Sequence, residues 1–233
     1  MSKVDLRSQF PSVRSQRGLL SCTALVICDA LWSGLQRGDA SAEPAGQFSP
    51  SALFLYYNAR KRAGHENHNA AVRPTDALDA LKEHGICSEE CWPYIIEKYR
   101  ERPPGPAYDN ALRFKNVGFE ALRQDADQLR TSLDAQVPFF FCLRLFVSNQ
   151  WEFDYGETRR TGRLKATGDS ERPVRNHALL AVGYDDATAS FLARNSFGEQ
   201  WGDRGYVSVP YEYLLHPQKA YGFSSCNLTT FAQ

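Results

Sequence analysis

The stretch NHALLAVGYDDATASFLARNSFGEQWGDRGY, Asn176–Tyr206, decides the fold of the second half of the chain. Two apolar runs flank the turn DDAT, residues 185–188, a pattern that is typical of two antiparallel strands joined as a hairpin. In such a hairpin, the sequence numbers of any two residues that face each other add up to nearly the same value. His177 is therefore expected opposite Asn195 or its neighbour. Facing Cβ atoms lie about 5 Å apart, within reach of a side-chain hydrogen bond. The spacing therefore predicts that His177 and Asn195 meet.

Cys22 stands at the start of an apolar, helix-like run in SQRGLLSCTALVICDALW, residues 15–32. A helix N-terminus stabilises a thiolate through its dipole and its unbonded N–H groups. Histidine can take the thiol proton, and an asparagine oxygen that accepts from the other ring nitrogen fixes the imidazole tautomer. Gln16 lies six residues before Cys22, where its side-chain NH₂ and the Cys22 backbone N–H are expected to hold an oxyanion. Cys22, His177, Asn195 and Gln16 together predict an acyl-transfer site that needs no metal and no cofactor.

The charge and length of the chain narrow the classes of partner. Its 233 residues suffice for one large domain or two small lobes, and 27 basic residues balance 27 acidic ones. Without a net charge, neither nucleic acid nor an anionic membrane is expected as a main partner. The apolar stretch over residues 137–146 contains Arg144 and is too short to span a bilayer. We expect a monomer.

The cysteines and the N-terminal sequence indicate the compartment. Six cysteines are too few and too scattered for a small disulfide framework, and MSKVDLRSQFPSVRSQ lacks the apolar core of a signal peptide. We expect reduced thiols and a cytoplasmic protein, with export by a route that uses no signal peptide as the alternative.

Helical patterns dominate the first half of the chain. Helices are expected over residues 22–37, over 50–62 with Ser49 as N-cap, and over 74–85. The basic residues 60–62 are expected to form a solvated helix end. The prolines of ERPPGPAYDN, residues 101–110, predict a stiff extended connector. It would separate a helical lobe, about residues 15–105, from a β lobe, about residues 106–225.

Strand-like segments dominate the second half. After one more helix over residues 125–136, strands are predicted for FFFCLRLFV, HALLAVGYD, SFLARNS and GYVSVP. Residues 151–175 form a long polar segment in which Trp151, Phe153 and Tyr155 alternate with polar residues. This alternation predicts part of a hairpin followed by a flexible loop. The segment is either an elaborated surface loop or a rim over a binding cleft.

Several motifs resemble those of the papain-like cysteine peptidases, the C1 family. VDLRSQFPSVRSQRGLLSC is similar to the mature N-terminus of that family, where a glutamine precedes the nucleophilic cysteine by six positions. RPTDALDALKEHGIC with CWPY, NHALLAVGY, and RNSFGEQWGDRGY resemble its helical-lobe, His and Asn segments. The resemblance, to a bacterial-type intracellular or effector-like member, covers nearly the whole chain. It implies one α+β papain-like domain over residues 1–233, in which a helical lobe and a β-barrel-like lobe flank an active-site cleft.

The resemblance also implies a role for each candidate residue. Cys22 would be the nucleophile, His177 the base and acid, Asn195 the residue that orients the imidazole, and Gln16 the oxyanion donor. The activity would be hydrolysis of peptide bonds in a peptide or protein substrate, through a thioester acyl-enzyme. Residues carried over to substrate binding are Leu20, Ala71, Val72, Pro74, Asn176, Phe197 and Trp201.

Three departures from the family pattern bear on the candidate site. The usual Cys-Gly-Ser-Cys-Trp signature is replaced by LLSCT, so that Leu20 stands where a glycine lines the groove and is expected to narrow or reshape it. Ala71 and Val72 replace paired glycines whose contacts to the substrate are made by the main chain. Phe197 stands where a tryptophan usually shields the His and Asn pair, with Trp201 as a second aromatic residue nearby.

Other interpretations of the same residues stay open. The four catalytic side chains also suit an acyltransferase or deamidase with a protein target, and Leu20 also suits a pseudo-peptidase that only binds peptides. A zinc site is a further alternative, since HENH supplies His65 and His68 and the sequence adds Cys87 and Cys91. Two unlinked thiols are the expectation for the last two residues.

Overall fold

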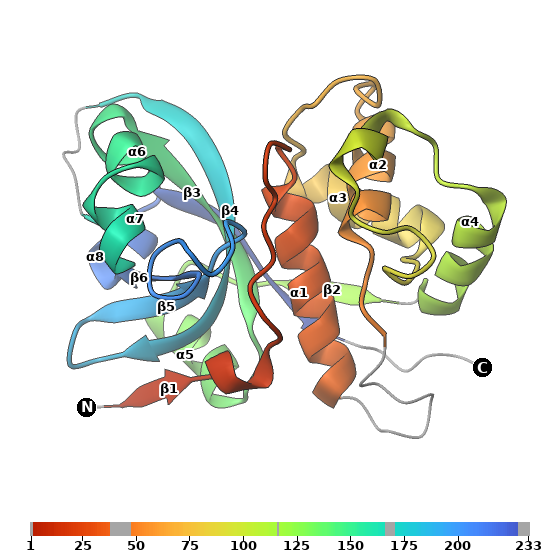
Figure 1. Cartoon of the computed structure of the whole chain (residues 1–233). Helices are drawn as coiled ribbons and strands as arrows, with labels where there is room; N and C mark the ends of the chain where they lie inside the picture. Colours follow the sequence, from red (N-terminus) through yellow and green to blue (C-terminus); the bar gives the residue numbers. More distant parts are fainter. Residues whose placement is uncertain (1, 38–47, 116, 166–170, 228–233) are drawn as a thin grey trace. The chain divides into compact units, whose positions relative to one another are not determined.

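A computed structural model describes residues 2–37, 48–115, 117–165 and 171–227 (Figure 1). The chain forms two compact units, which we call the β unit, Met1–Ser15 with Ala121–Ser225, and the helical unit, Gln16–Glu120 with Cys226–Gln233. The β unit thus includes the first residues of the chain, and the helical unit runs past residue 105, where the predicted helical lobe ends. Gly38, which was expected to follow the first helix, lies outside the described residues.

The positions of the first three helices of the helical unit can be explained by residues in and next to them. Helix α1 spans Cys22–Arg37 and is buried along most of its length, as its broad apolar face predicts. Helix α2 spans Ala52–Arg62, and Ser51 is its N-cap, since the Ser51 side chain accepts from the Phe54 N–H. The prediction of Ser49 as N-cap was wrong. The helix begins only after Ser51 because Pro50 still forms an isolated antiparallel bridge with Ser88. The Ser51 hydroxyl also donates to the Trp92 carbonyl, 2.5 Å away.

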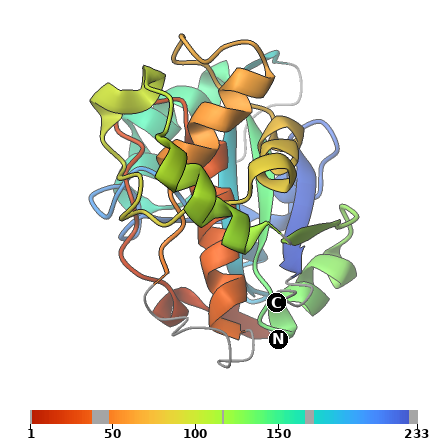
Figure 2. The same cartoon turned by 90° about the vertical axis from the view of Figure 1, so that its right-hand side faces the viewer.

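Helix α3, Pro74–His84, has proline in its first turn and ends at Gly85. Gly85 has a φ of 74°, which favours glycine, and a Cβ there would lie 2.0 Å from the Ala111 carbonyl oxygen. Glycine therefore lets the end of α3 approach the next helix closely. Figure 2 views the helical unit from the side on which α2, α3 and α4 lie.

The proline-rich segment 101–110 contains a helix, so its prediction as an extended connector was wrong. Pro104 is the N-cap of α4, Gly105–Ala111, and Pro106 lies in its first turn, positions where a missing N–H costs no hydrogen bond. This part of the chain also holds the 3₁₀ helices η2 (Ile96–Arg100) and η3 (Leu112–Phe114) and the short strand β2 (Gly118–Ala121).

An antiparallel sheet forms the core of the β unit. Its strands run in the order β7 (Ala220–Asn227), β3 (Phe139–Phe146), β4 (Pro173–Asp185), β5 (Ser190–Arg194) and β6 (Tyr206–Pro210), while β1 (Lys3–Asp5) also pairs with β4. The predicted strands correspond to β3, β4, β5 and β6 (Figure 1). The rings of Phe139, Phe141 and Phe223 pack against one another on this sheet, with centroids about 6 Å apart.

Strand β4 is irregular at Gly183. Its register with β5 shifts between Ala181 and Gly183, and a Cβ on Gly183 would lie 2.2 Å from the carbonyl oxygen of Val4 in β1. Glycine therefore permits the close approach of β1, a strand that the sequence pattern did not indicate.

Short helices connect the strands. They are η1 (Arg7–Gln9), α5 (Ala126–Asp134), α6 (Val147–Asp154), α7 (Glu157–Thr161) and α8 (Tyr211–Leu214). Helix α5 is capped by Asp125, whose carboxylate accepts from the Gln128 N–H at 2.9 Å. Among the residues that the structure describes, no helix combines the length and apolar character needed to cross a membrane.

Helices α6 and α7 occupy the segment predicted as a hairpin, so that prediction was wrong. Asn149 accepts from the Phe146 N–H at 2.7 Å and so begins the turn into α6. At the other end, Asp154 accepts two hydrogen bonds from Arg175 of β4, at 2.8 and 2.9 Å. These contacts to the sheet favour a helix over the hairpin that the alternation indicated. Residues 166–170 of the predicted loop lie outside the described residues.

Candidate active site

His177 and Asn195 are joined by a buried hydrogen bond in the β unit. Nε2 of His177, within β4, lies 2.6 Å from Oδ1 of Asn195, the first residue after β5. The predicted contact is therefore present, although the two residues are not direct cross-strand partners. Leu180 pairs with Arg194, and the loop between the strands spans residues 186–189 rather than 185–188, which shifts the register. Asn195 directly follows the last paired residue of β5, and its side chain contacts His177 from there.

The surroundings of Asn195 fix the imidazole tautomer. Its Oδ1 also accepts from the Ser196 backbone N–H at 2.7 Å, so this atom of the amide must be the oxygen. Nε2 of His177 is then the donor in the bond to Asn195, which leaves the lone pair of a neutral imidazole on Nδ1. The arrangement provides a base nitrogen at Nδ1. Nδ2 of Asn195 is buried and has no hydrogen-bond partner within the described residues.

Three aromatic rings, Phe153, Phe197 and Trp201, form what we call the aromatic cluster around His177. Ring centroids of Phe153 and Phe197 lie 5.3 and 4.8 Å from that of His177. Trp201 packs on Phe153 at 4.8 Å, and its Nε1 donates to the Phe153 carbonyl at 2.8 Å. Phe197 and Trp201 thus lie where the sequence predicted a shield for the histidine. Phe153 was not assigned to the site, because its segment was predicted as a hairpin.

Burial keeps the His177 imidazole neutral. The side chain is 3% exposed, and this burial lowers its pKa to about 3, while the hydrogen bond to Asn195 acts in the opposite direction and the charge of Arg175 lowers the pKa further. Arg175 is paired with Asp154, which ties the charge to the end of α6. A negative charge close to the ring would oppose the effect of burial and favour the protonated form.

Cys22 is the first residue of α1 in the helical unit and is partly exposed. The residues before it are held by Tyr94, whose hydroxyl lies 2.5 Å from the Ser21 hydroxyl and donates to the Gln16 carbonyl at 3.2 Å. Gln16 is buried, and its Nε2 donates to the Leu19 carbonyl at 2.7 Å. Cys22 and Gln16 thus lie on one short, bonded segment, while the contact of Cys22 with His177 stays a prediction.

Leu20 forms an exposed rim next to this segment, with 43% of its surface accessible. Its backbone N–H donates to Oδ1 of Asn69 at 2.8 Å, and Nδ2 of Asn69 donates to the Gly18 carbonyl at 2.8 Å. The Tyr56 hydroxyl donates to the same Oδ1 at 2.8 Å. Asn69 therefore holds the backbone on both sides of Leu19. This contact has no local signal in the sequence, because Asn69 lies 51 and 49 positions after Gly18 and Leu20.

The other candidate substrate residues lie on two elements. Val72 is buried and accepts from the Thr23 hydroxyl at 3.1 Å, next to Cys22, whereas Ala71 is exposed. Pro74 begins α3 in the same unit. In the β unit, Asn176 is exposed on β4 beside His177. The groove that these residues were expected to line stays a prediction.

Arg60 is fully buried, so its prediction as part of a solvated helix end was wrong. Its guanidinium donates to the carbonyls of Glu66 and His68, at 2.6 and 2.8 Å, and to the carbonyl of Tyr99. It also stacks on the Tyr56 ring, with 4.1 Å from Cζ to the centroid. Arg60 replaces water as the donor to these carbonyls and thereby shapes the loop that leads to Asn69.

The residues of the zinc alternative do not converge. The described residues contain no group of three or more His, Cys, Asp or Glu side chains that could hold a metal ion. All six cysteines are described, and none is in a disulfide bond. Cys87 is buried, which raises the pKa of its thiol to about 12, whereas Cys91 is exposed.

Comparison with known proteins places this geometry in a family. The protein-family model described as papain family cysteine protease matches residues 64–227 of the chain. This range includes His177 and Asn195 but not Cys22. The chain is 27% identical over 231 residues to an uncharacterized peptidase C1-like protein of Acanthamoeba polyphaga mimivirus. This match covers 96% of this chain and 72% of that protein. It is 28% identical to cysteine proteinase 2 of Zea mays over 58% of this chain and 36% of that protein.

A solved structure extends the similarity to the whole fold. Xylellain, a cysteine protease from Xylella fastidiosa, is 30% identical and superimposes with a TM-score of 0.86 over 98% of this chain and 86% of that chain. The match to the maize protein spans well under two thirds of that relative's length.

Proposed function

Because the chain belongs to the papain family of cysteine proteases and has the α+β fold of xylellain, we propose that this peptidase cleaves peptide bonds with Cys22 as nucleophile and His177 as base. Asn195 orients the imidazole, and Gln16 with the Cys22 backbone N–H holds the oxyanion. The observation that carries this proposal is the hydrogen-bonded His177 and Asn195 pair, because its tautomer leaves Nδ1 as the base.

The proposed reaction has two stages, acylation of Cys22 and hydrolysis of the resulting thioester. Nδ1 of His177 takes the Cys22 thiol proton, and the thiolate sulfur attacks the substrate carbonyl carbon while the carbonyl π electrons move to oxygen. The tetrahedral intermediate collapses, the C–N bond breaks, and His177 gives its proton to the leaving amine. Water then attacks the thioester, with His177 as base, and releases the acid and the Cys22 thiol.

The electrostatics of the two partners support an ion pair. Burial disfavours an isolated imidazolium at His177, whereas a thiolate close to Nδ1 would supply the negative charge that stabilises it. Cys22 at the N-terminus of the 16-residue helix α1 gains further stabilisation of the thiolate from the helix dipole. The proposal therefore requires that protonation of His177 and ionisation of Cys22 occur together.

Chemical labelling tests the nucleophile. The chain is incubated with an epoxysuccinyl inhibitor, and the adduct is located by peptide mass spectrometry. We expect one adduct on Cys22, loss of labelling in Cys22→Ala, and much slower labelling in His177→Gln. Cys91 is an internal control, because it is exposed but lies at no helix N-terminus. Equal labelling of Cys22 and Cys91 would contradict an activated Cys22.

The reaction type needs a second measurement, because exposed Leu20 beside the nucleophile favours a restricted substrate range. A peptide library is incubated with the chain and with Cys22→Ala. Cleavage that depends on Cys22 supports a peptidase. Labelling of Cys22 without cleavage of any peptide would favour the acyltransferase or deamidase alternative, and absence of both would favour a peptide-binding pseudo-peptidase.

A further inference from the structure

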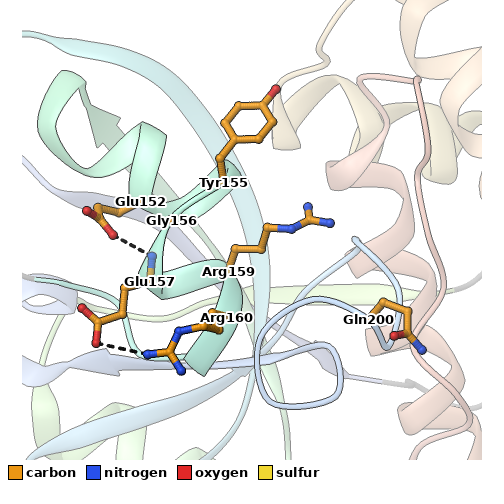
Figure 3. A pocket seen from close by; sticks show the side chains of 7 residues that line it. All are labelled: Glu152, Tyr155, Gly156, Glu157, Arg159, Arg160 and Gln200. Atoms are coloured by element: carbon orange, nitrogen blue, oxygen red, sulfur yellow. Dashed lines mark hydrogen bonds and ion pairs between the residues drawn. The ribbon is translucent and has the colours of Figure 1, made fainter.

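A pocket of about 840 Å³ lies in the β unit, at helices α6 and α7 and the loop after β5 (Figure 3). Its lining residues are Glu152, Tyr155, Gly156, Glu157, Arg159, Arg160 and Gln200. Tyr155 is 75% exposed, so the pocket is open to solvent. Neither the proposed catalytic residues nor the residues carried over to substrate binding line it.

The two acidic residues of the pocket are already engaged. Glu152 accepts from the Glu157 backbone N–H at 2.7 Å, and the Glu157 carboxylate pairs with Arg160 at 3.8 Å. Arg159 donates to the Asp154 backbone carbonyl at 3.3 Å and has no carboxylate partner within the described residues. In Figure 3, Glu152, Glu157 and Arg160 lie together on one side, and Arg159 extends to the other side. Arg159 is thus the cation of the pocket that can receive an external carboxylate.

The pocket is linked to the aromatic cluster around His177 by neighbouring residues in the chain and by a backbone hydrogen bond. Glu152 directly precedes Phe153, which packs on the His177 ring, and Gln200 directly precedes Trp201. The backbone N–H of Gly202 donates to the Arg159 carbonyl at 2.6 Å. The backbone of Arg159 is therefore joined to the loop that carries Trp201 of the aromatic cluster.

We propose that Arg159 binds a carboxylate of the substrate on the leaving-group side of the scissile bond. This inference rests on the proposed function, in which His177 protonates the leaving amine, so that the leaving segment passes over the β unit. A guanidinium recognises a carboxylate through two parallel hydrogen bonds. The carboxylate is either the side chain of an acidic residue or the C-terminus of a short leaving segment.

The test compares kcat/KM for matched fluorogenic peptides. One set carries Glu or Gln at successive leaving-group positions, and the other ends two residues beyond the scissile bond as a free acid or an amide. An acidic side chain or a free C-terminus is expected to raise kcat/KM about fivefold over its neutral partner, as for an exposed ion pair. The gain should decrease at high salt. Whichever set shows the gain identifies the source of the carboxylate.

Arg159→Gln should abolish the gain, so that the acidic peptides are cleaved no faster than their neutral partners. Arg123→Gln, which removes an exposed charge of the same unit away from the pocket, should keep the gain. If wild type cleaves neutral peptides but shows no gain, or if Arg159→Gln retains it, the carboxylate site is refuted while the peptidase stands.

If wild type cleaves none of these peptides, the proposed function fails instead. Fluorescence anisotropy of labelled acid and amide peptides then decides the site by binding alone. Weaker binding of the acid to Arg159→Gln than to Arg123→Gln supports the site, and equal binding refutes it.

Discussion

The side-chain oxygen of Asn195 lies 2.6 Å from Nε2 of His177 and so holds the imidazole with its proton on that nitrogen. Replacing Asn195 by Ala removes the acceptor and lets the ring rotate, so kcat should fall about 100-fold with little change in KM. Steady-state kinetics with a neutral peptide check this expectation. An Asn195→Ala enzyme with wild-type kcat would show that the hydrogen bond does not orient the base.

Asn195→Asp is the matched variant, because a carboxylate oxygen still accepts from both His177 and Ser196. The added negative charge should raise the pKa of His177. In an enzyme that uses an imidazolium, activity at high pH is lost when that ion deprotonates. The alkaline limb of the kcat/KM profile should therefore move to higher pH. A shift to lower pH would contradict the assigned role of His177.

The buried His177 imidazole should make stability depend on pH in Cys22→Ala, which lacks the proposed thiolate partner. The pKa of His177 is lowered to about 3, against about 6.5 for an unfolded histidine. Between these values the unfolded chain binds the extra proton, so stability is complete above about pH 6.5 and is lost as pH falls toward 3. The loss should be about 1.4 kcal/mol per pH unit.

Urea unfolding of Cys22→Ala from pH 4 to 7 measures this slope. The double variant Cys22→Ala with His177→Gln is the control, because it retains every carboxylate that also titrates at low pH. The difference between the two slopes isolates the histidine. Equal slopes would mean that burial does not hold His177 neutral.

Phe153 should contribute to the rate as well as to the stability. Phe153→Leu keeps an apolar side chain in the core, at a cost of about 1 kcal/mol, but opens the face of the His177 ring that Phe153 covers. Phe141→Leu is a control at another fully buried phenylalanine of the β unit. We expect similar losses of stability in urea, with a lower kcat only for Phe153→Leu. Equal kcat values would limit Phe153 to packing.

Tyr94 should act on the nucleophile through its hydroxyl group. Tyr94→Phe removes the contacts to Ser21 and Gln16 on the segment that carries Cys22, and each is worth about 1 kcal/mol. The rate of Cys22 alkylation and kcat should both fall several-fold. Tyr108→Phe removes a hydroxyl that donates to Asn58 in the same unit, at 2.8 Å, and should leave both rates unchanged. Unchanged alkylation in Tyr94→Phe would contradict the positioning role.

The main elements could be predicted because their signals are local. The periodicity of residues 22–37 and the apolar runs around 139–146 and 176–194 give α1, β3, β4 and β5 directly. Helix α6 could not be predicted in this way, because its ends are set by contacts with β4 such as that of Asp154 with Arg175. The prolines near α4 led to the wrong prediction of an extended connector, because proline favours the first turn of a helix as well as an extended chain.

The residues of the candidate site also differ in whether their signals are local in the sequence. His177 and Asn195 could be paired from their spacing around a turn. Cys22 and Gln16 were predicted from their place at and before the start of an apolar helix, and the resemblance then implied a role for each residue. Arg60 and Tyr94 could not be found, because they bond to residues 39 and 78 positions away in the sequence. A buried arginine at a helix end looks like a solvated one until the carbonyls that it binds are known.

Arg60 also sets how the rim of the helical unit can open. Its guanidinium joins α2 to the backbone of residues 66–68, and Asn69 joins that loop to the N–H of Leu20. The Leu20 amide hydrogen can therefore exchange with solvent only when the Asn69 contact breaks. Its exchange rate should follow that of the α2 amides rather than that of surface loops, so that loop and helix open as one cooperative unit.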